Sequence, residues 1–326
     1  MRLNRIAWAA VIAAAALAAN AAAARSAAYK GAIATDAATG AVLFEDNADS
    51  VSPPASMTKL MTFAVLDDAI RKGSLSLSTP VTVTSEDARV AALRDSTEVW
   101  LRQGETFPVE ELIYAMMIQS ANDAAYALAH KAGGTAGAFV AQMNEKARAL
   151  GMVHSTFRSP NGFPPPSRRI SEGDLTTPRD YALLCRYLVL HTDILKYTSI
   201  RNRTFGAGMR LQPVLMKNHN NLLGKIPGVD GLKTGFTSGA GFCLSATAQR
   251  NGHRIIVVMM DSPDSKTRDL NVEGIITDAF IRIPITEASF SRAPAGAAEP
   301  TRPELSAPSP QSAPDSGPVI HMPGSK

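Results

Sequence analysis

The chain has 326 residues, of which 45% are hydrophobic and 19% charged, so it can build a sizeable apolar core. This composition excludes a disordered, collagen-like or coiled-coil protein. Two cysteines cannot form a disulfide framework or a cysteine-rich metal centre, and the six histidines lack metal-binding spacing. The formal net charge is only +4, so we expect no nucleic-acid partner. The cysteine and histidine patterns predict no metal site, and we expect no cofactor.

The first 24 residues have the layout of a secretory signal peptide. Arg2 and Arg5 precede an apolar run over residues 6–19, and repeated Ala-x-Ala follows. The run is short and rich in alanine for a membrane-spanning helix, so a retained anchor is the weaker alternative. No cysteine stands directly after the run, so no lipid attachment is expected. Cleavage after residue 24 would lower the net charge from +4 to +2.

Composition also changes near the other end of the chain. Residues 291–326 are rich in proline and alanine and poor in bulky apolar side chains. We expect a disordered tail there, without an amphipathic membrane anchor. The intervening residues, 25–290, fit one domain with an inserted or flanking subdomain.

Hydrophobic periodicity predicts strands at both ends of this domain and helices between them. Two short strands, 32–35 and 41–44, form a hairpin. Helices are expected at 56–73, 108–119, 124–131, 135–150 and from 177 onwards. Three strands and a helix follow at 231–236, 241–249, 254–261 and 265–281. This order predicts an α+β fold with an antiparallel sheet formed from both ends of the chain, and excludes a doubly wound nucleotide-binding fold.

Ser56 and Lys59 stand three residues apart at the start of a predicted helix, which places a hydroxyl and an amine on one face. The amine can then accept the proton of the serine. A Ser-x-x-Lys match occurs by chance about once in 300 residues, and its plainer interpretation is a capping serine with a solvated lysine. However, the apolar residues Met57, Leu60 and Met61 would bury this helix, and a lysine in a buried helix requires an explanation.

Two further short motifs carry polar groups. Lys233-Thr234-Gly235 lies in a predicted strand, where the plainer interpretation is an edge strand with a glycine bulge. Ser120 and Asn122 interrupt a predicted helix, so both side chains project from a turn.

Taken in order, Ser-x-x-Lys, Ser-x-Asn and Lys-Thr-Gly form the active-serine set of penicillin-binding proteins and serine β-lactamases. The chain closely resembles the serine-type D-alanyl-D-alanine carboxypeptidases, which are low-molecular-mass penicillin-binding proteins. The resemblance covers roughly residues 30–285 and includes the stretches 54–62, 120–125 and 229–237. It implies an antiparallel sheet flanked by helices, a mostly helical subdomain at about 75–215, and a site in the cleft between them.

The resemblance further implies a bacterial cell-wall enzyme, secreted across the inner membrane to the periplasm. Its expected partners are peptidoglycan stem peptides, with β-lactam antibiotics as covalent inhibitors. Two features depart from the family. Many relatives have a β-rich second domain and a membrane-binding C-terminal helix, whereas only the proline-rich tail follows here. The segment 162–169 also differs from the usual loop of the family.

The catalytic residues implied by the resemblance are Ser56, Lys59 and Ser120. Ser56 would attack the carbonyl of the penultimate D-Ala while Lys59 accepts its proton, and Ser120 would pass the proton to the leaving amine. Lys59 must be neutral for this role. Burial and the nearby cation of Lys233 both disfavour its charged form.

The remaining expected site residues bind substrate. Asn122 would hold the substrate backbone or Lys59, and the N–H groups of Ser56 and Phe236 would form the oxyanion hole. Arg268 begins the last predicted helix, where the alternative is a solvated arginine, and matches a carboxylate-binding position of the family. The full substrate-binding set is Asn122, Lys233, Thr234, Gly235, Phe236, Thr237 and Arg268.

Three other functions compete with a D,D-carboxypeptidase. A class A β-lactamase would have a Glu-x-x-Leu-Asn loop before its Thr-Thr-Pro stretch, and residues 171–175 lack it before Thr176. A D,D-endopeptidase stays open as an alternative. A catalytically dead peptidoglycan-binding protein is disfavoured because Ser56, Lys59 and Lys233 are all present.

Residues outside the motifs have simpler interpretations. Cys185 and Cys243 are expected to be buried and free, and Trp100 and the pair Met116-Met117 to lie in the core.

Overall fold

The computed structural model describes residues 29–93 and 96–283. The predicted signal peptide, residues 1–24, and the predicted tail, residues 291–326, lie outside the described residues. A separate helical subdomain at about 75–215 stays a prediction.

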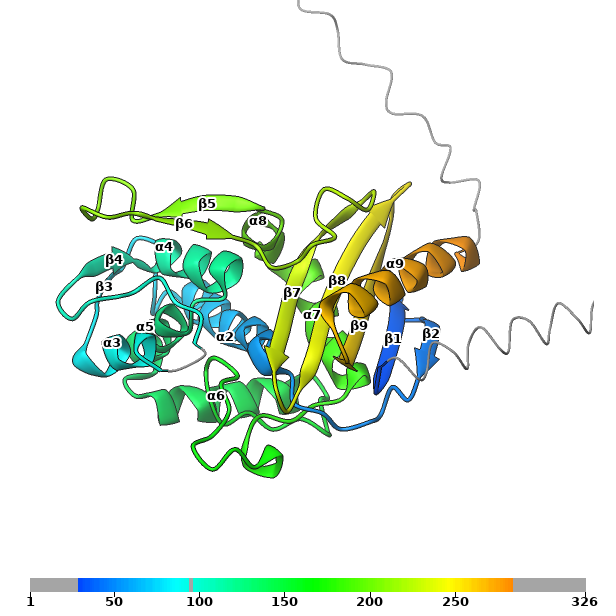
Figure 1. The fold of residues 1–326 in the computed structure, drawn as a ribbon, viewed down its shortest axis with the longest axis horizontal. Helices are drawn as coiled ribbons and strands as arrows, with labels where there is room; N and C mark the ends of the chain where they lie inside the picture. The colour runs from blue at the N-terminus through cyan, green and yellow to red at the C-terminus, as the bar shows by residue number, and fades with distance from the viewer. Residues whose placement is uncertain (1–28, 94–95, 284–326) are drawn as a thin grey trace, which may run out of the picture. The chain divides into compact units, whose positions relative to one another are not determined.

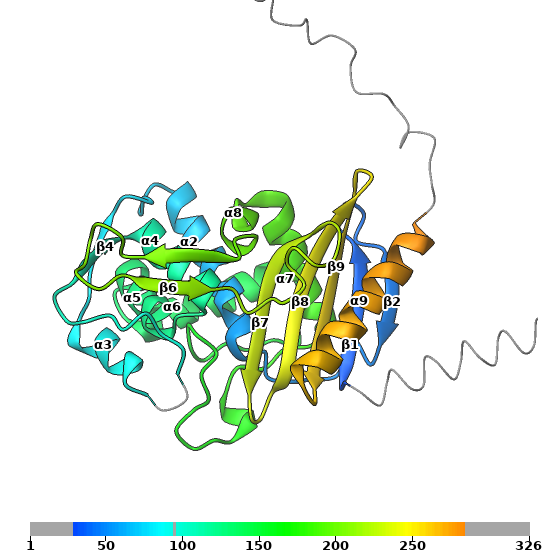
Figure 2. The ribbon, with the colours of Figure 1, turned by 45° about the horizontal axis from the view of Figure 1, so that its top comes forward.

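Both ends of the described chain contribute to a five-stranded antiparallel sheet with the order β2-β1-β9-β8-β7 (Figures 1 and 2). Its strands are β1 (Gly31–Asp36), β2 (Val42–Asp46), β7 (Val229–Thr237), β8 (Gly241–Arg250) and β9 (His253–Ser262). The predicted α+β fold is therefore confirmed. Because β7 is an edge strand, alternate N–H and C=O groups on its outer side have no partner within this sheet.

Helices cover both faces of the sheet because its central strands are apolar on both sides. Val257 of β9 packs in one cluster with α9 (Ser265–Arg282). Val258, one residue further on, packs on the opposite face with α7 (Pro178–His191). The run of apolar residues in β9 thus anchors a helix on each side.

The chain between β2 and β7 contains every described helix except α9, and much of it lies beside the β7 side of the sheet (Figure 1). The helical elements before α7 are a 3-10 turn (Ala55–Thr58), α2 (Lys59–Arg71), α3 (Ser85–Ala91), α4 (Val109–Tyr114), a π-helical turn (Ala115–Gln119), α5 (Asn122–Gly133), α6 (Ala136–Ala149) and a 3-10 turn (Ile170–Glu172). After α7 comes α8 (Ile194–Thr198). No helix in the described part of the chain is long and apolar enough to cross a membrane.

Two short antiparallel strand pairs were not predicted from the sequence. β3 (Pro80–Thr82) pairs with β4 (Thr106–Pro108), and β5 (Asn202–Phe205) pairs with β6 (Val214–Lys217). Strands of three or four residues are too short for an alternating pattern to be recognised.

The expected core position of Trp100 is wrong, because 54% of this residue is exposed. Its neighbours Val99 and Leu101 are buried, and both donate backbone N–H groups to the carboxylate of Asp123. With both neighbours turned inward, Trp100 points to solvent. The expectations for the cysteines and for Met116-Met117 are confirmed, since all four are buried and both thiols are free.

The N-terminus of α7 gives a test of the fold. Thr177 is fully buried, and its hydroxyl accepts the N–H of Asp180 at 3.1 Å. Thr177→Ala should lower the free energy of unfolding by about 1–2 kcal/mol, because the cap is lost inside the core. Thr277→Ala is the control, since this exposed hydroxyl bonds only within α9 and should change stability by less than about 0.5 kcal/mol. Equal losses in urea denaturation would contradict the assignment of this cap.

Candidate active site

Ser56 lies in the 3-10 turn that leads into α2, and two backbone segments close on this turn from different sides. A Cβ atom on Gly235 of β7 would lie 2.4 Å from the carbonyl oxygen of Pro54. A Cβ atom on Gly162 would lie 1.9 Å from the carbonyl oxygen of Ala55. Only glycine permits either approach, so the two glycines fix the turn that carries Ser56.

The amine of Lys59 is the centre of the candidate site. Its Nζ lies 3.0 Å from Ser56 Oγ, 2.7 Å from Asn122 Oδ1 and 2.8 Å from the carbonyl oxygen of Asn161. The last two oxygens can only accept hydrogen bonds. A neutral amine would donate its two N–H groups to them and keep its lone pair for the hydroxyl of Ser56. This geometry suits proton transfer from the serine.

The surroundings of Lys59 favour its neutral form. The side chain is fully buried, and this burial lowers the pKa of Lys59 well below its usual value of 10.5. The positive charge of Lys233 lowers this pKa further. The buried carboxylates of Asp123 and Asp174 oppose the shift without cancelling it.

Asn122 is held at the start of α5 by a break in the preceding helix. The π-helical turn ends at Ser120, which has left-handed backbone angles (φ +65°), and the chain then restarts as α5. The amide Nδ2 of Asn122 donates to Ser96 Oγ at 3.0 Å, which leaves Oδ1 for Lys59. Ser120 itself is buried, and in the described part of the chain its hydroxyl makes no hydrogen bond to Lys59 or Lys233.

Lys233 brings a second buried amine to the site. Its Nζ donates to the carbonyl oxygen of Thr234 at 3.1 Å. Burial, and then the charge of Arg268, lower the pKa of Lys233 to about 7. Arg268 is also buried, and its guanidinium pairs with Asp269 at 2.6 Å.

A hollow of about 260 Å³ opens beside Ser56. Of the residues expected from the sequence, Ser56, Asn122, Phe236 and Thr237 line it. The other six expected residues do not line the hollow and lie behind or beside its wall. They are Lys59, Ser120, Lys233, Thr234, Gly235 and Arg268. The other six wall residues were not predicted from the sequence. They are Thr97, Gly162, Phe163, Pro164, Arg168 and Ser238.

The loop that contributes most of these missed residues is tied down by Asp174. This buried carboxylate accepts the hydroxyl of Thr58 at 2.7 Å and the N–H groups of Arg158 at 2.6 Å and Ser159 at 3.0 Å. It therefore couples the segment before Asn161 to the turn of the serine. Nothing in the spacing of these residues along the chain predicts this contact.

No group of three or more His, Cys, Asp or Glu side chains within residues 29–93 and 96–283 is placed to hold a metal ion. The chemistry that the described side chains can supply is nucleophilic attack by a serine hydroxyl, with a buried amine as the base.

Comparison with known proteins agrees with this chemistry. A family model described as D-alanyl-D-alanine carboxypeptidase matches residues 17–264. The chain belongs to this family. The carboxypeptidase DacC of Escherichia coli is 36% identical over 252 residues, and DacF of Bacillus subtilis is 33% identical over 256 residues. These alignments cover 76% and 77% of this chain but only 60% and 62% of the relatives, so the chain spans about three fifths of their length.

Solved structures of similar proteins confirm the fold expected from the family resemblance. The carboxypeptidase DacD from Francisella tularensis has a TM-score of 0.71 at 27% identity, covering 77% of this chain and 70% of that structure. Penicillin-binding protein D2 from Listeria monocytogenes, in its ampicillin-bound form, has a TM-score of 0.68 at 31% identity. That comparison covers 78% of this chain and 97% of the other.

The close approach of β7 to the serine turn can be tested by adding a single methyl group. Gly235→Ala should lower the free energy of unfolding by about 2 kcal/mol or more, because the new Cβ meets backbone that cannot move aside. Gly239→Ala is the matched control just beyond β7, where the nearest atom is 3.4 Å away on a flexible Ile170 side chain. Chemical denaturation should separate the two variants, and an unchanged Gly235→Ala protein would contradict the proposed clamp.

Proposed function

We propose that this chain is a serine D,D-carboxypeptidase that removes the terminal D-Ala from peptidoglycan stem peptides. The observation that carries the proposal is the buried Lys59 amine, which lies 3.0 Å from the Oγ of Ser56, a residue that lines an open hollow. Membership of the D-alanyl-D-alanine carboxypeptidase family and the activities named for DacC and DacF support it.

In the proposed reaction, Ser56 Oγ attacks the carbonyl carbon of the penultimate D-Ala and its proton passes to Nζ of Lys59. The tetrahedral intermediate collapses when the amide nitrogen of the last D-Ala receives a proton and leaves. Ser120 stays the predicted donor for that step. The product is an ester between Ser56 and the shortened peptide, together with free D-Ala.

The backbone supplies the expected charge stabilisation. The N–H groups of Ser56 and Phe236 are the proposed oxyanion hole for the developing negative charge. Since β7 is an edge strand, an extended peptide can pair with it beside the serine. Water then hydrolyses the ester and frees the enzyme.

The same nucleophile would react with β-lactam antibiotics, which present a strained amide at the position of the scissile bond. The ampicillin-bound form of the Listeria protein D2 supports this proposal. The alternative function is that of a D,D-endopeptidase, which would hydrolyse crosslinked peptides with the same nucleophile and base. A β-lactamase is disfavoured by the segment 171–175, which lacks the deacylating glutamate motif.

We also propose that the protein is secreted across the inner membrane to the periplasm and associates there with the cell wall. The signal-peptide pattern of residues 1–24 supports export. Peptidoglycan, the proposed substrate, lies in that compartment.

Covalent labelling tests the proposed nucleophile and base. Ser56→Ala should show no adduct with fluorescent penicillin, because the attacking oxygen is absent. Lys59→Ala should acylate on the order of 10²-fold more slowly or worse, because its base is lost. The matched controls are Ser76→Ala and Lys72→Ala, which change exposed residues at or beyond the end of α2 and should label normally. Full labelling of a folded Ser56→Ala protein, confirmed by mass spectrometry, would overturn the proposal.

The proposed binding of the substrate carboxylate by Lys233 has a pH signature. Because the pKa of Lys233 is about 7, its charge is present below that pH and lost above it. The kcat/KM ratio of a D-Ala-D-Ala peptide to its C-terminally amidated form should therefore fall by up to about tenfold between pH 6 and pH 9.

Arg268→Ala removes the charge that helps to lower the pKa of Lys233, so it should move this fall in the ratio to higher pH. It should also lower kcat/KM for the free acid by roughly 10- to 100-fold, with less effect on the amide. A ratio that stays constant with pH would place carboxylate binding elsewhere.

A further inference from the structure

A second hollow, of about 300 Å³, lies next to the one beside Ser56. The two hollows share six lining residues, so they lie next to each other, and we refer to them together as the groove. The shared residues are Gly162, Phe163, Pro164, Arg168, Thr237 and Ser238. The segment 162–173 builds its outer wall. Residues 162–169 of this segment are those expected from the sequence to differ from the usual loop of the family.

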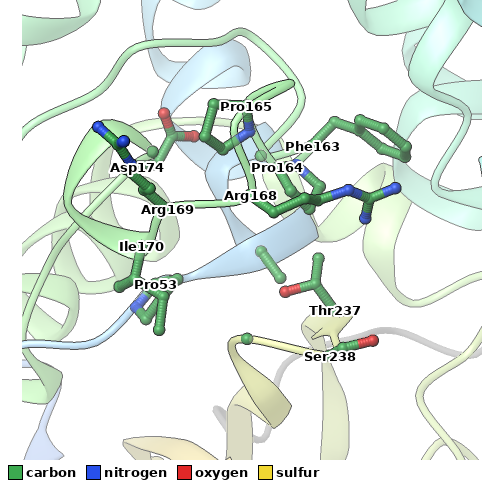
Figure 3. A pocket seen from close by; sticks show the side chains of 14 residues that line it. Pro53, Phe163, Pro164, Pro165, Arg168, Arg169, Ile170, Asp174, Thr237 and Ser238 are labelled. Atoms are coloured by element: carbon green, nitrogen blue, oxygen red, sulfur yellow. The ribbon is translucent and has the colours of Figure 1, made fainter.

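Two adjacent arginines of this loop differ in orientation and in partners (Figure 3). Arg169 points away from Thr237, and its guanidinium pairs with Glu172 at 3.0 Å. Arg168 points to the opposite side, between the ring of Phe163 and the side chain of Thr237. Within the described part of the chain, the guanidinium of Arg168 makes no hydrogen bond or ion pair.

The backbone directs Arg168 into this position. Its φ of +58° lies in the left-handed region, which residues with a side chain rarely adopt. The carbonyl oxygen of Pro165 accepts the N–H of Arg168 at 2.9 Å and closes the turn. A strained turn thus presents an unpaired cation to the groove beside the serine.

The direction of the substrate shows which of its groups would meet this cation. Under the proposed function, the terminal D-Ala carboxylate lies toward Lys233, at the inner part of β7. The acyl part of the substrate must then leave Ser56 in the opposite direction, past Thr237 and Ser238. Arg168 lies over that end of the strand, in the wall of both hollows.

We infer that Arg168 is a specificity-determining residue that binds an anionic side chain on the residue preceding D-Ala-D-Ala. This inference rests on the proposed function for the direction of the substrate. The planar guanidinium offers paired donors to a carboxylate, and Phe163 and Ile170 offer apolar surface to the stem of the same side chain. A neutral amide at that position would lose the charge interaction.

The test uses two peptides that end in D-Ala-D-Ala and differ only in the preceding side chain, which ends in a carboxylate or in its carboxamide. The wild-type protein should favour the carboxylate by about tenfold in kcat/KM for D-Ala release at low ionic strength. Arg168→Gln should reduce this ratio to about 1, with the carboxamide peptide changed less than about twofold. Arg169→Gln is the matched control and should keep the wild-type ratio, because Arg169 is paired with Glu172 and lines only the hollow that Ser56 does not reach.

Three results would overturn the inference: no discrimination by the wild-type protein, equal effects of Arg168→Gln and Arg169→Gln on the ratio, or equal losses on both peptides in Arg168→Gln. Failure of the wild-type protein to release D-Ala from either peptide would contradict the proposed function instead. In that case the role of Arg168 would be tested by comparing the rates at which two penicillins, with and without a carboxylate on the acyl side chain, acylate the protein. Arg168→Gln should abolish that preference too, and an unchanged preference would overturn the inference.

Discussion

The buried amine of Lys59 is the constraint on which the rest of the site depends. Three segments far apart in the sequence meet at its Nζ: the serine turn through Ser56, the start of α5 through Asn122, and the loop carrying Asn161. Each supplies one oxygen, so the amine defines where all three must lie. Two of those oxygens only accept hydrogen bonds, which directs the lone pair of a neutral amine toward the serine.

Keeping this amine buried costs stability. The pKa of Lys59 in the folded protein is well below 10.5, its usual value, so the unfolded chain binds more protons between those two pH values. Stability must therefore rise with pH across that window. Close packing around the amine offsets this cost. Gly235 and Gly162 allow their backbone segments to pack directly against the serine turn. Asp174 accepts hydrogen bonds from both Thr58 and the loop before Asn161.

The sequence was sufficient to predict the sheet, the long helices and the three motifs, because these depend on local periodicity and short spacings. It also predicted that Lys59 would be buried. It did not reveal the carbonyl of Asn161, since any residue has a carbonyl and only the fold selects this one. Arg168 was missed for a related reason: its exposure to the groove depends on a left-handed turn at a non-glycine residue. Trp100 was misplaced because its hydrophobicity, and not the inward turn of its neighbours, guided the prediction.

The most direct test of this account is the protonation state of Lys59 itself. Heteronuclear NMR of protein with ¹⁵N-labelled lysine would follow the Nζ resonance of Lys59 through a pH titration, with the signal identified by its absence in Lys59→Ala. The account predicts the chemical shift of a neutral amine at pH values well below 10.5. An ammonium signal that persists until about pH 10.5 would contradict the central role given to this residue.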